Sequence, residues 1–196
     1  MAAEAQGERL SEEELSSMVA LLFVTGHETV VNLLGNGALV LMQHPEQLAC
    51  LLADNSDAAW DAAVEELLRF DGPVETSTTR GRARTSPCTA AEIKRGDVVR
   101  VVITSANRDE RQFACPHQLD LQRDDVNAHL AFGRGAHYCL GAPLARLEGR
   151  IALRSCSRLA VLAADVTAQN SPGASASSSA AGCAAHRAVK RIGSGV

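Results

Sequence analysis

The stretch Phe132-Gly133-Arg134-Gly135-Ala136-His137-Tyr138-Cys139-Leu140-Gly141 places one cysteine in a loop that is rich in glycine. Glycine lets the backbone approach a flat ligand closely and lets successive amides point toward it. A helix is predicted to begin just after Cys139, and the positive end of its dipole favours an ionised sulfur. The pattern therefore favours a metal-ligating thiolate over the alternative, a glycine-rich turn with a structural cysteine.

The composition is that of one domain, or one domain and a tail, in 196 residues. Hydrophobic residues make up 46% of the chain but aromatic residues only 3%, so we expect a core of Ala, Leu and Val. The net charge of -4 argues against a nucleic-acid partner, because nucleic-acid binders concentrate positive charge on one face. The acidic start lacks the order of a signal peptide, and the apolar run Met18 to Val24 is too short to span a bilayer. These features predict a cytoplasmic protein with no membrane partner.

Helix signals cover much of the chain. Ser11-Glu12-Glu13-Glu14 is a capping box, and the apolar residues beyond it predict a long, buried helix to about Gln43. His44-Pro45 predicts the start of a short second helix, and a third is predicted over Asp57 to Phe70. A last helix is predicted from about Ala142 to Leu162. The fold class is therefore expected to be mainly α.

Little β-structure is expected. The β-branched segments Val74 to Arg80 and Val98 to Ile103 are predicted strands, whereas Arg82 to Arg95 between them gives no signal. Residues 163–196 are rich in Ala and Ser and contain too few apolar residues to form a core of their own. We therefore expect residues 1–162 to form the folded unit and the remainder to be a disordered tail.

The glycine-rich loop resembles the heme-binding signature of the cytochrome P-450 family, with matching residues at Phe132, Gly135, His137, Cys139 and Gly141. The resemblance implies the mainly helical cytochrome P-450 fold, represented here by its carboxy-terminal part. It also implies heme b as cofactor, with Cys139 as the axial iron ligand whose electron donation promotes cleavage of the oxygen–oxygen bond. Phe132 would then shield the sulfur from water, and His137 would hydrogen-bond a heme propionate.

Thr25-Gly26-His27-Glu28-Thr29, within the long helix, resembles the oxygen-binding groove of that family. The Thr29 hydroxyl could donate a hydrogen bond to bound dioxygen and the Glu28 carboxylate could relay protons, so both are candidate catalytic residues. Gly26 is expected to let the helix bulge and admit oxygen. His27-Glu28 also begins a zinc-protease motif, but Val31 stands where a second histidine is required, which excludes that site.

Two further motifs lie between the long helix and the glycine-rich loop. Glu66 and Arg69 share a helix face, and a pair with this spacing is by default a solvated surface pair. The resemblance instead implies a buried structural ion pair that braces the cysteine loop. Arg80 ends a predicted strand, and the resemblance implies that its guanidinium binds a heme propionate. The alternative for Arg80 is a solvent-exposed arginine at a sheet edge.

The motifs follow the order of the family, and the resemblance extends over roughly Glu4 to Arg158, closest to soluble bacterial members that act in secondary metabolism. It implies a monooxygenase that inserts one oxygen atom from O2 into a small organic substrate. Electrons would come from ferredoxin and ferredoxin reductase, with Arg134 and Arg146 as candidate docking residues. A peroxygenase of the same superfamily, against which Glu28 and Thr29 argue, and a catalytically inactive heme-binding fragment are the alternatives. Because the amino-terminal half of the family has no counterpart here, we expect the product of a truncated or frame-shifted gene.

Overall fold

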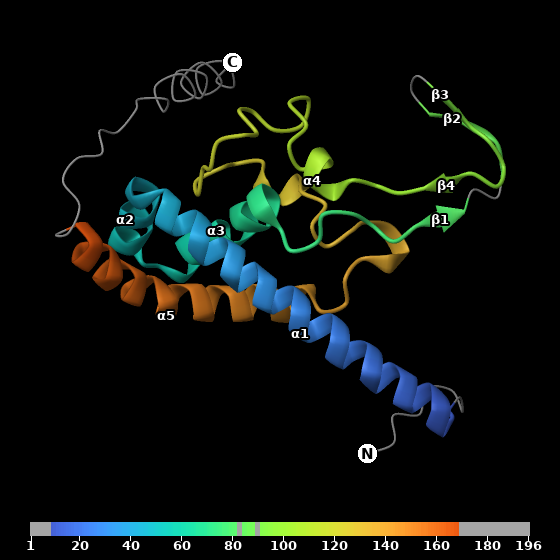
Figure 1. Cartoon of the computed structure of the whole chain (residues 1–196), viewed down its shortest axis with the longest axis horizontal. Coiled ribbons are helices and arrows are strands. Elements are labelled where there is room, and N and C mark those ends of the chain that lie inside the picture. Colours follow the sequence, from blue (N-terminus) through green and yellow to red (C-terminus); the bar gives the residue numbers. More distant parts are fainter. Residues whose placement is uncertain (1–8, 82–83, 89–90, 169–196) are drawn as a thin grey trace, which may run out of the picture.

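The computed structural model describes residues 9–81, 84–88 and 91–168 and is mainly helical (Figure 1), which confirms the predicted fold class. Its helices are α1 (Glu12–Gln43), α2 (Pro45–Asp54), α3 (Asp57–Asp71), α4 (Ile103–Ala106) and α5 (Ala142–Ala168), with short 3-10 helices η1 (Val126–Ala128) and η2 (Gly135–His137). Its strands are β1 (Arg80–Gly81), β2 (Ser86–Cys88), β3 (Ala91–Ile93) and β4 (Val98–Val99). Helix α5 thus continues past the predicted end at Leu162, and the rest of the predicted tail, 169–196, lies outside the described residues.

Helix α1 begins where local hydrogen bonds cap it. The Ser11 hydroxyl accepts from the Glu14 amide at 3.2 Å, and the Glu14 carboxylate accepts from the Ser11 amide at 2.9 Å. The helix then continues through Gly26 to Gln43 as one α-helix, so the bulge expected at Gly26 is not formed. By length and composition alone α1 could cross a membrane, but this is weak support because core helices of soluble proteins meet the same criterion.

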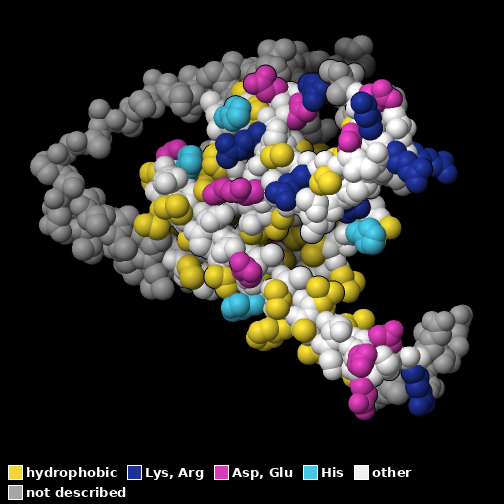
Figure 2. Space-filling model, turned by 45° about the vertical axis from the view of Figure 1, so that its right-hand side comes forward, with side chains coloured by type: hydrophobic (Ala, Val, Ile, Leu, Met, Phe, Trp, Pro, Cys, Tyr) yellow, Lys and Arg dark blue, Asp and Glu magenta, His cyan; other side chains and the backbone are white. Residues whose placement is uncertain are grey.

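Only the second half of α1 belongs to the core, where its buried residues are Leu33, Gly37, Val40 and Leu41. In the first half, the large apolar side chains from Leu15 to Val24 are exposed, Phe23 at 75%. This half projects from the other helices (Figure 1) and carries hydrophobic side chains along its surface (Figure 2). The expectation of burial along the whole helix is therefore wrong, because the described part of the chain supplies no element that covers the first half.

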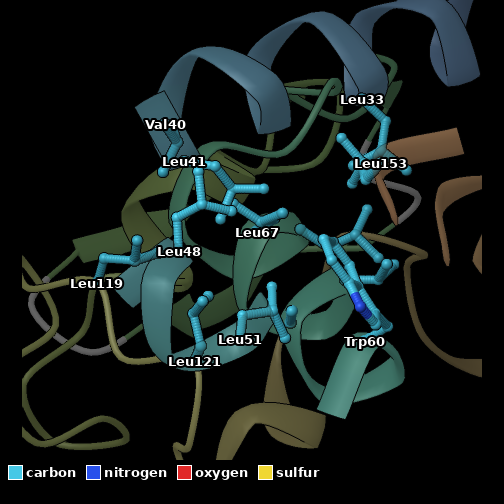
Figure 3. Packing of buried hydrophobic residues seen from close by; sticks show 13 residues of the cluster. Leu33, Val40, Leu41, Leu48, Leu51, Trp60, Leu67, Leu119, Leu121 and Leu153 are labelled. Carbon is cyan, nitrogen blue, oxygen red and sulfur yellow. The ribbon is translucent and has the colours of Figure 1, made fainter. Parts of the chain in front are cut away.

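The core forms where α1, α3 and α5 pack together. Two glycines permit this close approach: a Cβ on Gly37 in α1 would lie 3.2 Å from Leu153 in α5, and one on Gly149 in α5 would lie 3.3 Å from Val64 in α3. The junction is filled by side chains that are at most 2% exposed, among them Leu33, Trp60, Leu67 and Leu153 (Figure 3). Burial of each such side chain contributes roughly 1.5–3 kcal/mol, so the junction holds α3 and α5 firmly together.

The β-structure is shorter than the sequence predicts. Strands β1 and β4 pair antiparallel, with Arg80 opposite Val99, and Thr76 forms an isolated bridge with Val102. The two predicted strands therefore lie side by side, but Ile103 already belongs to α4. The sequence does not predict the hairpin of β2 and β3, because Ser, Pro and Glu interrupt any β-branched pattern there.

Candidate functional site

The cysteine loop, defined here as residues 129–141, leads directly into α5 (yellow to orange in Figure 1). Gly133 and Gly135 have φ angles of +75° and +84°, a left-handed conformation that other residues rarely adopt. The Cys139 amide donates to the Phe132 carbonyl at 3.0 Å and closes the loop on itself. Cys139 is exposed, three residues before α5 begins at Ala142. The loop thus presents the sulfur to solvent beside the amino-terminal end of a helix.

The surroundings of Cys139 suit a ligand that needs a single protein sulfur. A Cβ on Gly135 would meet nothing within 4 Å, and one on Gly141 would lie 3.9 Å from Cys139 Sγ, so side chains do not crowd the thiol. Within the described residues, no group of three or more His, Cys, Asp or Glu side chains could hold a metal ion. A single cysteine sulfur therefore does not match a metal centre built from protein side chains alone, which needs several ligands. A heme does, because the porphyrin supplies four nitrogen ligands and the protein needs to add one axial sulfur.

Behind the loop, Glu66 and Arg69 form an ion pair whose side chains are both 0% exposed. Arg69 Nε donates to Glu66 Oε2 at 2.7 Å and Arg69 Nη2 donates to Glu66 Oε1 at 2.8 Å, so the contact is bidentate. A second arginine, Arg123, donates from Nε to Glu66 Oε2 at 3.1 Å, and the Asp120 amide donates to Glu66 Oε1 at 2.9 Å. The solvated surface pair that was the default interpretation is therefore excluded. Arg123 lies 57 residues from Glu66 in an irregular segment, where no spacing rule identifies it.

Asn107 connects this ion pair to the cysteine loop. Arg69 Nη1 donates to the Asn107 carbonyl at 2.8 Å, and the Asn107 side-chain oxygen accepts from the Leu130 amide at 2.7 Å. Asn107 is only 2% exposed, so both bonds lie in the interior. The charged pair on α3 is thus linked through one residue to the backbone just before Phe132.

A second set of contacts surrounds Glu65, the neighbour of Glu66. Its carboxylate accepts from His129 Nε2 at 2.9 Å and from Arg146 Nη2 at 3.0 Å. Burial raises the pKa of Glu65, but the hydrogen bonds from His129 and Arg146 and the charge of Arg146 outweigh it and lower the pKa to about 2. The same bond raises the pKa of Arg146. Arg146 is therefore engaged within the fold, which argues against its predicted docking role, whereas Arg134 is exposed.

The remaining predicted site residues are more exposed, and all of them except His137 lie outside the cysteine loop. Glu28 is exposed and Thr29 half-buried on α1, where the Thr29 hydroxyl donates to the Thr25 carbonyl at 2.7 Å. Arg80 is exposed on β1 and His137 is exposed on η2. The structure thus brings Phe132, His137 and Cys139 together in one loop with Glu66 and Arg69 behind it. In the described part of the chain, no hydrogen bond or ion pair joins Glu28, Thr29 or Arg80 to that group.

Comparisons with known proteins point to the same family that the sequence of the cysteine loop resembles. The cytochrome P-450 family model matches residues 59–158. The cytochrome P-450 monooxygenase PikC of Streptomyces venezuelae is 49% identical over 162 residues, which are 82% of this chain and 38% of that protein. The solved structure of the bacillaene polyketide synthase cytochrome P-450 PksS of Bacillus subtilis is 45% identical with a TM-score of 0.74, over 80% of this chain and 39% of that one. P450BioI, solved in complex with an acyl carrier protein ligated to hexadec-9Z-enoic acid, is 40% identical with a TM-score of 0.72, over 78% of this chain and 39% of that one.

The chain spans about two fifths of the length of the curated relatives it matches. The family match runs from within α3 through the irregular segment and the cysteine loop into α5, so it contains the buried ion pair and Cys139. Several of the relatives are named as monooxygenases or as enzymes of polyketide biosynthesis. The resemblance seen in the sequence is thus confirmed, and the chain belongs to the cytochrome P-450 family.

Proposed function

We propose that this chain is the heme-binding, carboxy-terminal part of a monooxygenase, with Cys139 as the axial thiolate ligand of heme b. The observation that carries the proposal is the exposed Cys139 thiol, on a loop shaped by two positive-φ glycines and next to Gly141, which places no side chain against the sulfur. The family match over this loop supports it. A bound heme would supply the activation of dioxygen, so that two electrons and two protons place one oxygen atom in the substrate and release the other as water.

The residues around Cys139 are proposed to hold the cofactor and protect its sulfur. Phe132 is half-buried in the same loop, and its carbonyl accepts a hydrogen bond from the Cys139 amide. Its ring is proposed to shield the sulfur from water once the cofactor is bound. Gly135 and Gly141 leave room for a flat ring against the loop. His137 and Arg80 are exposed donors, and we assign them to the heme propionates.

Glu28 and Thr29 are proposed to supply protons for the oxygen chemistry that a bound heme would provide. The Thr29 hydroxyl donates to the Thr25 carbonyl, so it would have to rotate before it could donate elsewhere. Glu28 is exposed and can exchange protons with water. A peroxygenase, which receives its oxygen atom from peroxide, has no use for such a pair, and this favours the monooxygenase.

The partners are proposed from the same chemistry. We assign electron delivery to ferredoxin and ferredoxin reductase, as the resemblance to soluble bacterial members of the family implies, with the exposed Arg134 as a candidate docking residue. Relatives such as PikC and PksS support a small organic molecule of secondary metabolism as substrate and a cytoplasmic location. The structure in which P450BioI is bound to an acyl carrier protein adds a carrier-attached acyl chain as a form in which the substrate could arrive.

The test is an absorption spectrum of the full chain loaded with heme, reduced and exposed to carbon monoxide. A strongly red-shifted Soret band is expected, because a thiolate donates electron density to the iron. Cys139→Ser should abolish the shift, whereas Cys156→Ser, which removes another exposed cysteine on α5, should keep it. An unshifted band in the unaltered chain, or a shift that survives Cys139→Ser, would overturn the assignment.

The second candidate is a heme-binding chain without turnover, and the exposed first half of α1 favours it. Leu15 to Val24 lie next to the proposed proton-handling residues Glu28 and Thr29, and solvent access there would let water compete with an organic substrate. A shifted Soret band without product formation in the presence of ferredoxin, ferredoxin reductase and a reduced nicotinamide cofactor would select this candidate.

A further inference from the structure

Glu65 occupies an unusual place, because it is a nearly buried carboxylate that contacts two other elements. It lies on α3 with a side chain that is 10% exposed, and it binds His129 of the cysteine loop and Arg146 of α5. Its neighbour Glu66 binds a different pair of side chains, Arg69 and Arg123. Two adjacent carboxylates on one helix therefore hold separate sets of partners.

The contact with His129 fixes the orientation of that ring. His129 Nδ1 accepts a hydrogen bond from the Ala131 amide at 3.1 Å, so Nδ1 carries no proton. Nε2 must then be the protonated nitrogen, and it donates to the Glu65 carboxylate at 2.9 Å. The ring is thus held in one tautomer, which positions the backbone of Ala131 directly before Phe132.

The contact with Arg146 reaches the other side of the same loop. Both Nε and Nη2 of Arg146 donate to Glu65, which makes the pair bidentate. The guanidinium lies 4.6 Å from the centroid of the Phe132 ring, a cation–π contact. Its Nη1 is 3.1 Å from the Tyr138 hydroxyl, next to Cys139. Glu65 thereby sets the position of the two aromatic rings that come before the cysteine in the loop.

We propose that Glu65 is a positioning residue for the cysteine loop: it clamps His129 and Arg146, and through them it fixes Ala131, Phe132 and Tyr138 around Cys139. The proposal rests on the proposed function only for the role of Cys139 as metal ligand. The contacts of Glu65 are distinct from those of the ion pair between Glu66 and Arg69, which reaches the loop backbone at Leu130 through Asn107. Glu66 thus reaches the loop through the Leu130 amide, whereas Glu65 reaches it through side chains of the loop and, by way of His129, the Ala131 amide.

The first test is hydrogen–deuterium exchange on the full 196-residue chain without heme, so it does not depend on cofactor binding. Glu65→Gln keeps the shape of the side chain but removes its charge. The amides of Ala131 and Cys139 should exchange about tenfold faster or more, because loss of a charge-assisted contact weakens the closed loop by at least that factor. The amides of the core segment 33–41 in α1 should accelerate by a smaller factor, because they exchange through unfolding of the whole domain and not through opening of the loop.

Asp61→Asn is the matched control, because Asp61 also lies on α3 and pairs with an arginine of α5, Arg150, at 3.2 Å, but at the surface and away from the loop. It should leave loop exchange unchanged. Arg146→Gln is the second variant, in case Glu65→Gln does not fold, and it should accelerate the same loop amides. Loop exchange equal to that of the unaltered chain, or equal acceleration in segment 33–41, would overturn the proposal.

A spectroscopic readout separates positioning of the sulfur from general stability. In the heme-loaded chain reduced under carbon monoxide, Glu65→Gln should increase the fraction of unshifted Soret band several-fold at a temperature where the helix content is unchanged. Asp61→Asn should not. If the unaltered chain shows no thiolate band at all, the proposed function fails while the exchange experiment still decides the role of Glu65.

Discussion

Replacement of Arg69 by alanine tests the buried brace behind the cysteine loop. Arg69 makes two bonds to Glu66 and donates to the carbonyls of Asn107 at 2.8 Å and Pro116 at 2.9 Å. Removal of one partner of a buried ion pair typically costs about 3–5 kcal/mol, because the other charge stays buried without its counterion. Arg123 still contacts Glu66 in the variant, which places the expected loss toward the lower end, at about 3 kcal/mol. That is a large share of the roughly 5–15 kcal/mol that stabilises a typical domain.

The assay is urea denaturation of the chain without heme, followed by the fluorescence of Trp60. This residue is the only tryptophan in the chain, is 0% exposed, and lies on the same helix as Arg69. Arg69→Lys keeps the charge but not the planar fork, so it should lose less stability than alanine. Arg150→Ala is the control: its pairs with Asp57 and Asp61 are at the surface, and the expected change is below about 1 kcal/mol. Equal unfolding free energies for Arg69→Ala and Arg150→Ala would refute the reasoning.

Two further outcomes follow from the packing and the charges. Gly35→Ala should stabilise the chain by about 0.5–1 kcal/mol in the same urea assay, because a Cβ there meets nothing within 4 Å and alanine favours the helix. Gly37→Ala, two residues away, should instead destabilise the chain by about 1 kcal/mol, since the new Cβ would lie 3.2 Å from Leu153. A change in unfolding free energy of the same sign for both variants would contradict the packing of α1 on α5. The pKa of Glu65 is lowered from 4.5 to about 2, so its stabilising effect is present above pH 4.5 and is lost as the pH falls toward 2. The unfolding free energies of Glu65→Gln and the unaltered chain should therefore differ at neutral pH and converge over that window, and a difference independent of pH would show that the Glu65 charge does not stabilise the fold.

The long helices and the cysteine loop could be predicted because their signals are local. Ser11 caps α1 and Ser56 caps α3 through hydrogen bonds that span three residues. Glycine at positions 133 and 135 permits the left-handed backbone that the loop adopts, and a cysteine in such a glycine-rich loop indicates a ligand site. The hairpin of β2 and β3 could not be predicted, because its residues carry no β-branched pattern. It forms through pairing between the two strands, which the residues of either strand alone do not indicate.

The sequence by itself determined where the four longer helices begin, the loop and the spacing of Glu66 and Arg69, since each depends on interactions within a few residues. Only the tertiary structure decided that this pair is buried, that Arg123 and Asn107 join it, and that Arg146 pairs with Glu65. These contacts connect residues 38 to 81 positions apart, and no local pattern encodes such a pairing. The exposure of the first half of α1 was decided in the same way, because burial depends on which elements pack against a helix and not on its own apolar content.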